Sequence, residues 1–92
     1  MKRHVLNGIE LLDRALPEWY KKIDVASLNM ALCDKCILGQ CYGWYETGLE
    51  ILDLHGDYAY LFGFDTPPHQ RDVTHDDLML EWITAIKEKR NE

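Results

Sequence analysis

Apolar residues at helical spacing near both ends of the chain are the feature that most limits its fold. Ile9, Leu12 and Leu16 recur every three or four residues, and a second stripe runs from Leu78 to Ile86. Residues three or four apart share one face of a helix, so each stripe predicts an amphipathic helix. Strand-like spacing occurs only in residues 28–32. The chain of 92 residues is therefore predicted to be a small all-α single domain, residues 1–92, of four to five short helices.

Capping and helix-breaking residues predict where the first helices begin and end. Asn7 followed by Glu10 matches an N-cap with a carboxylate three residues later. Pro17 should end that helix and start a second one, which carries Trp19. Residues 24–32 mix periods of two and three. This mixture predicts a short irregular or 3₁₀ turn and then extended chain leading to the cysteines.

The second half of the chain has its own helix signals. A helix is predicted from Asp34, with a close packing face or a break near Gly48. Asp57 is expected to cap a short helix that ends at Gly63. Thr74 is expected to cap the last helix, whose terminal charges suit the helix dipole.

Negative charge is concentrated in residues 46–81. This segment contains nine acidic residues and one basic residue, Arg71, which gives a net charge of −8. Such a block repels a phosphate backbone, so direct nucleic-acid binding is not expected. It favours a basic protein surface as partner, with an ordinary solvated face as the alternative. An exposed tyrosine in the block, Tyr58 or Tyr60, would be a suitable anchor. The candidate partner-binding residues are Glu46, Glu50, Asp53, Asp57 and Asp65.

Hydropathy argues against a membrane protein. No apolar run approaches the roughly 18 residues that span a bilayer. The N-terminal segment also lacks the continuous apolar core of a signal peptide. The protein is therefore expected to stay in a cytoplasm, where disulfides are disfavoured and a cysteine pair favours metal binding or catalysis.

All three cysteines fall within one short stretch, "CDKCILGQC". A C-x-x-C pair at a turn that enters a helix is half of a zinc site, so Cys33, Cys36 and Cys41 are candidate ligands of a structural zinc that would staple the domain. The fourth ligand would be one of the histidines, His4, His55, His69 or His75. The pair could instead be a redox dithiol at a helix N-terminus. The thiols could also be buried small apolar groups, and spacing alone leaves all three alternatives open.

Two segments, "CILGQCYG" (residues 36–43) and "GFD" (residues 63–65), resemble sequences in a group of small proteins found in actinobacteria and in phages and prophages of Gram-positive bacteria. That group carries a C-[VI]-L-G-Q-x-[YF]-G segment before a G-F-D loop. The matching residues are Cys36–Gly39, Gln40, Tyr42, Gly43, Gly63, Phe64 and Asp65, and looser similarity extends from residue 8 to residue 86. The resemblance implies a setting on mobile genetic elements rather than an activity. Many members of the group show only the cysteine before V-L-G-Q, so a metal site that uses Cys33 and Cys41 would be particular to this chain.

Catalytic signatures are absent from the sequence. Ser27 is the one serine and lacks a nucleophile elbow, and no phosphate loop or dinucleotide fingerprint occurs. The leading hypothesis is a non-enzymatic accessory protein of phage or prophage type that binds and inhibits a protein in the host-cell cytoplasm through its acidic surface. The specific version is an anti-CRISPR-like inhibitor that blocks DNA loading of a Cas9-type nuclease, whose channel for nucleic acid is basic. The alternatives are a zinc-stapled regulatory domain that acts on the transcription machinery, and a thiol redox protein that uses Cys33 and Cys36.

Overall fold

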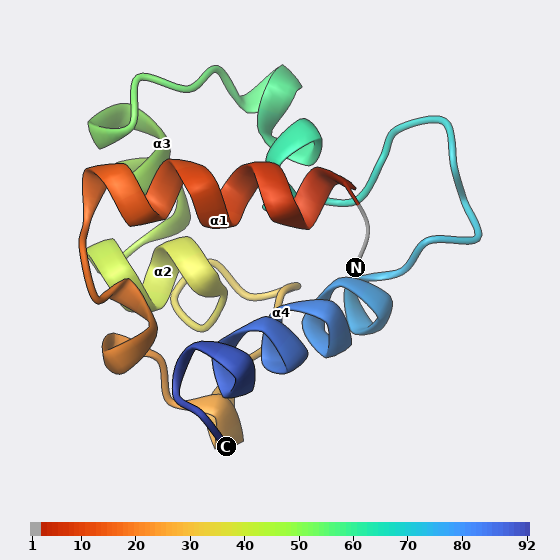
Figure 1. Cartoon of the computed structure of the whole chain (residues 1–92). Helices are drawn as coiled ribbons and strands as arrows, with labels where there is room; N and C mark the ends of the chain where they lie inside the picture. Colours follow the sequence, from red (N-terminus) through yellow and green to blue (C-terminus); the bar gives the residue numbers. More distant parts are fainter. Residues whose placement is uncertain (1–2) are drawn as a thin grey trace.

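Seven short helical segments make up the part of the chain that the computed structural model describes, residues 3–92 (Figure 1). They are α1 (Arg3–Ala15), η1 (Trp19–Lys22), η2 (Val25–Ser27), α2 (Ile37–Tyr42), α3 (Tyr45–Ile51), η3 (Gly56–Phe62) and α4 (His75–Lys89), where η marks a 3₁₀ helix. Residues 3–92 contain no strand, which confirms the small all-α architecture. The first two residues of the expected domain lie outside the described part.

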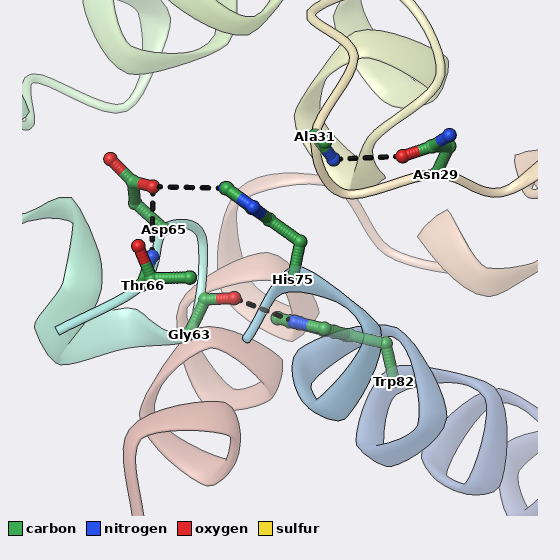
Figure 2. A network of polar contacts seen from close by, with 7 residues as sticks. All are labelled: Asn29, Ala31, Gly63, Asp65, Thr66, His75 and Trp82. Atoms are coloured by element: carbon green, nitrogen blue, oxygen red, sulfur yellow. Dashed lines mark hydrogen bonds and ion pairs between the residues drawn. The ribbon is translucent and has the colours of Figure 1, made fainter. Parts of the chain in front are cut away.

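The core is centred on two tryptophans that are fully buried, Trp19 of η1 and Trp82 of α4. Their rings meet edge to face at 5.7 Å, and Phe64 stacks on Trp82 at 5.7 Å. The Trp82 indole donates a hydrogen bond of 2.7 Å to the Gly63 carbonyl, so its one polar atom is satisfied within the core (Figure 2). This cluster fixes α4 against η1 and against the loop that follows η3.

The first helix is longer than the capping pattern indicated. α1 already includes Arg3, so Asn7 lies inside the helix and the predicted N-cap at Asn7 was wrong. The Asn7 amide instead donates a 3.0 Å hydrogen bond to the Leu61 carbonyl of η3. A Cβ on Gly8 would lie 2.1 Å from the Phe62 carbonyl oxygen, so glycine is what permits α1 and η3 to pack this closely.

The segment between α1 and α2 consists mainly of turns. The piece after Pro17 is a 3₁₀ helix that begins at Trp19, and the predicted 3₁₀ turn is present as η2. The predicted extended approach to the cysteines was wrong, because residues 30–36 form turns. One of these turns is closed by the Asn29 side chain, which accepts a 3.0 Å hydrogen bond from the Ala31 amide (Figure 2).

The helix predicted from Asp34 is two helices, α2 and α3, separated at Gly43 with φ 95°. Gly48 lies inside α3, so the predicted break there was wrong, while the predicted close packing face is confirmed. A Cβ on Gly48 would lie 2.9 Å from the Leu38 Cβ. The absence of a side chain at Gly48 therefore allows the two helices to pack directly on each other.

The remaining helix ends follow their predicted chemistry with one exception. Thr74 and Asp77 form a complete capping box at the start of α4, and Gly63 ends η3 with φ 73°, as expected. The cap of η3 is His55 rather than Asp57, because the His55 Nδ1 accepts a 3.1 Å hydrogen bond from the Asp57 amide. Within residues 3–92 no helix is both long enough and apolar enough to cross a bilayer.

Candidate functional site

The turn that carries the C-x-x-C pair is held against the start of α2. Cys36 is the N-cap of α2, and its buried Sγ accepts a 3.3 Å hydrogen bond from the Gly39 amide. A Cβ on Gly39 would lie 2.3 Å from the Cys33 carbonyl oxygen, so the turn packs closely on the helix. Cys33 is partly exposed on this turn, and Cys41 is partly buried on α2.

Burial shifts two of the three thiols, Cys36 and Cys41, further toward the protonated form. It raises the pKa of Cys36, and it raises the pKa of Cys41 to about 12. A redox dithiol relies on the opposite shift, a lowered pKa that yields a thiolate nucleophile. The surroundings of Cys36 and Cys41 therefore give no support to the redox alternative.

The C-x-x-C pair borders a small pocket of about 160 Å³, which we call the thiol pocket. It lies between four separate segments of the chain. Its polar lining consists of Cys33, Cys36, Tyr45, Asp65 and His75, and its apolar lining is the turn 30–32 with Phe64. Of the predicted zinc ligands, Cys33, Cys36 and His75 thus line the same pocket. Across residues 3–92 no three His, Cys, Asp or Glu side chains are close enough to hold a metal ion in this conformation, and zinc stays a prediction.

The other predicted zinc ligands lie elsewhere. Cys41 is not among the residues that line the thiol pocket. His4 meets Tyr60 edge to face at 5.7 Å, His55 caps η3, and His69 is on the exposed loop before α4. Of the four histidines that spacing could not separate, only His75 lines the thiol pocket.

Asp65 and His75 face each other at the edge of the thiol pocket (Figure 2). The Asp65 Oδ1 accepts a 2.8 Å hydrogen bond from the Thr66 amide and lies 3.7 Å from the His75 Nε2. The pKa of Tyr45 rises to about 12, first because of burial and then because of the Asp65 charge and the neighbouring thiols. Tyr45 is therefore a neutral hydroxyl at physiological pH.

A second hollow lies between α3 and η3, with a volume of about 640 Å³, and we call it the acidic groove. Its lining residues are Glu46, Leu49, Glu50, Asp53, Leu54, His55 and Gly56. Within the described chain, the carboxylates of Glu46, Glu50 and Asp53 make no hydrogen bond or ion pair. They therefore present three uncompensated negative charges around an apolar floor.

The five predicted partner-binding residues are divided between different surfaces. Glu46, Glu50 and Asp53 line the acidic groove, whereas Asp57 and Asp65 border a separate pocket of about 320 Å³. Each of these two aspartates also has a histidine neighbour, at 3.5 Å for the Asp57–His55 pair and 3.7 Å for the Asp65–His75 pair. These two aspartates therefore differ from the groove carboxylates in having a histidine side chain within 4 Å.

Asp53 adopts a backbone conformation that is uncommon for residues other than glycine. It follows α3 with φ 55°, in the left-handed region where glycine is common at the end of a helix. Its amide donates to the Glu50 carbonyl at 3.1 Å, and the Leu54 amide donates to the Leu49 carbonyl at 2.9 Å. This pair of bonds is a Schellman motif, which rigidly places the Asp53 carboxylate beside the groove.

Exposed apolar side chains on the elements that form the acidic groove add to its binding potential. Ile51 of α3 is 60% exposed and Tyr58 of η3 is 58% exposed. Sequence analysis named Tyr58 as a candidate but missed Ile51. Ile51 lies three residues after the buried Gly48, a spacing that would place it on the buried face of α3, so helical periodicity gave no signal of its exposure.

The residues that carry the resemblance to the phage and actinobacterial group serve mainly to hold the fold together. The Gln40 amide accepts from the Asp24 amide at 2.6 Å and donates to the Asp24 and Lys35 carbonyls at 3.2 and 3.0 Å. Gln40 thus ties the turn before η2 and the cysteine turn to α2. Comparison of the chain with protein-family models, with curated proteins and with solved structures finds no match.

Proposed function

We propose that this protein is a non-enzymatic binding module that takes a basic segment of a partner protein in the acidic groove. The observation that carries the proposal is the set of three unpaired carboxylates, Glu46, Glu50 and Asp53, around a groove with an apolar floor. Lysine or arginine side chains of a partner would neutralise these charges, while apolar groups of the same segment would cover Leu49 and Leu54.

The placement of the charges favours binding over stability. Glu46 and Glu50 are four residues apart on α3, where two like charges repel each other. Glu50 and Asp53 also lie near the carbonyl end of α3, where a negative charge is unfavourable. A basic partner would relieve both sources of repulsion, and this relief would add to the affinity of the complex.

The partner that best fits this chemistry is a protein with a basic channel for nucleic acid. As the sequence hypothesis has it, the host target is a Cas9-type nuclease, and the acidic protein would hinder DNA loading by occupying part of that channel. A transcription-machinery protein with a basic groove is the alternative target, because the same carboxylates would recognise it.

Charge reversal in the groove tests the binding mode directly. The triple variant with Glu46, Glu50 and Asp53 each changed to Lys is compared with the wild type for binding to a purified, guide-loaded Cas9-type nuclease and for inhibition of its DNA loading. We expect the variant to lose at least tenfold in affinity, and we expect wild-type association to slow as salt is raised. Wild-type protein that neither binds nor inhibits would refute this target.

A matched control variant separates the effect of the groove charges from the effect of overall net charge. Glu10, Asp72 and Glu88 are exposed and lie outside the acidic groove, so changing all three to Lys gives the same net charge on other surfaces. This control should retain wild-type binding. Equal loss in both triple variants would show that overall charge, rather than the groove, determines binding.

A further inference from the structure

We propose that Cys33, Cys36, His75 and Asp65 form a binding site for a zinc-like divalent ion, which joins the cysteine turn to the start of α4. This site differs from the set expected from spacing, because Asp65 replaces Cys41 and one histidine is selected. It shares no lining residue with the acidic groove, so it stands or falls independently of the proposed function.

The first argument is the convergence of suitable ligand types. Cys33 and Cys36 come from the turn before α2, Asp65 from the loop after η3, and His75 is the first residue of α4, yet all four line the thiol pocket. Two thiolates, an imidazole and a carboxylate are ligands that zinc accepts in a tetrahedral site. The pairing of a local C-x-x-C turn with distant ligands is common in such sites.

The second argument is the separation of Asp65 and His75. The Oδ1 and Nε2 atoms face each other at 3.7 Å, which is too long for a hydrogen bond. Two ligand atoms that each lie ~2.0 Å from a tetrahedral zinc are roughly 3.3 Å apart. The observed pair is therefore close to the spacing of two ligands that share one ion, and a small inward shift would complete it.

The third argument concerns the thiols. The Cys36 Sγ already accepts a hydrogen bond from the Gly39 amide, a contact that also stabilises a metal-bound thiolate. The Cys33 side chain is partly exposed at the pocket and makes no hydrogen bond in the described structure, so it is free to turn toward an ion. Because the ligand atoms do not converge in this conformation, binding requires the four side chains to move closer to one another.

Binding at this site has a defined proton balance. Two thiols lose their protons to solvent as two Zn–S bonds form, while His75 and Asp65 coordinate through lone pairs on nitrogen and oxygen. Uptake of one ion should therefore release about two protons near neutral pH, and affinity should rise with pH. The side chains of Asp65 and His75 are 48% and 42% exposed, which gives the ion a path from solvent.

Cobalt(II) is the probe, because its spectrum reports both thiolate ligation and tetrahedral geometry. The metal-free chain is titrated with Co²⁺ and then with Zn²⁺ as competitor. We expect a sulfur-to-metal charge-transfer band and tetrahedral ligand-field bands at one ion per chain, both displaced by Zn²⁺. The expected loss of affinity is at least 100-fold for Cys33→Ser and at least tenfold for His75→Ala and Asp65→Asn.

Cys41→Ser is the decisive control. Cys41 is the one thiol outside the pocket lining, so this variant should bind Co²⁺ within twofold of the wild type. Cys33 and His75 are not in the buried core, which lets circular dichroism confirm that their variants are folded. The absence of a charge-transfer band in the wild type would overturn the proposal, and so would equal losses in Cys41→Ser and Cys33→Ser.

Discussion

Replacing Asp53 with glycine should make the protein more stable and a weaker binder. Asp53 has φ 55° in the Schellman motif that ends α3. At the end of η3 the chain uses Gly63 in the same way, with φ 73° and the bonds Gly63 N–Tyr60 O of 3.1 Å and Phe64 N–Ala59 O of 3.2 Å. The chain therefore places glycine at one such position and an acidic residue at the other.

The size of the effect follows from three contributions. A left-handed conformation costs an L-residue about 1–2 kcal/mol, with Asp near the lower limit because its short side chain tolerates it. Glycine loses about 0.4–1 kcal/mol through the greater entropy of the unfolded chain. Removing a carboxylate near the carbonyl end of α3 gains about 0.3–1 kcal/mol. The free energy of unfolding should therefore rise by about 1 kcal/mol, which corresponds to about 4–8 °C in Tm.

Asp53→Asn separates the charge from the conformation. It keeps a residue that tolerates the left-handed region and removes only the carboxylate, so its gain should be smaller than that of Asp53→Gly and should vanish at high salt. Urea unfolding of both variants at low and high salt measures the two contributions. In binding assays both variants should lose affinity equally, because both lack the carboxylate. A decrease in stability for Asp53→Gly would refute the account of this helix end.

Three further substitutions test the packing and burial of the α2 region. Gly39→Ala should lower the free energy of unfolding by about 3 kcal/mol in urea unfolding, because its Cβ would lie 2.3 Å from the Cys33 carbonyl oxygen. Stability near that of the wild type would show instead that the cysteine turn can move away from α2. Gln40→Ala should cost about 2 kcal/mol by the same measurement, since it removes the hydrogen bonds to Asp24 and Lys35, and a loss below the error would contradict this clamp. The pKa of Cys41 is raised from 9.0 to about 12, so the folded chain holds this proton longer than the unfolded chain. Stability should therefore fall as pH rises from 9 toward 12, and Cys41→Ala should flatten that part of the pH–stability profile.

Local signals predicted the fold wherever the deciding contacts were themselves local. The capping box at Thr74 needs only a partner three residues away, and the glycine stop at Gly63 needs only a left-handed residue. Asn7 was misread because its amide has a distant partner, Leu61. The break between α2 and α3 was misplaced because packing against Leu38 requires the glycine at position 48 inside the helix. No spacing rule contains that contact.

The candidate sites show the same division. The excess of acidic residues was plain in the sequence. Which of them line the acidic groove (Glu46, Glu50 and Asp53) and which border the second pocket depends on how η3 packs against α3. The C-x-x-C pair was equally plain, whereas the choice of His75 over the other histidines depends on α4 starting beside the cysteine turn. Sequence supplies the ligand types in both cases, and tertiary contacts decide which of them meet.

The motif formed by the C-[VI]-L-G-Q-x-[YF]-G segment and the G-F-D loop therefore carries information about architecture more than about activity. Gly39, Gln40 and Phe64 hold turns, helices and core together through contacts that need no partner. The acidic groove and two of the four proposed metal ligands, Cys33 and His75, lie outside the motif. A chain with the same motif but without these residues should keep the fold and lose both binding properties. The double variant Cys33→Ser with His75→Ala reproduces half of that comparison: it should remain folded, bind a basic partner as before, and fail to bind cobalt.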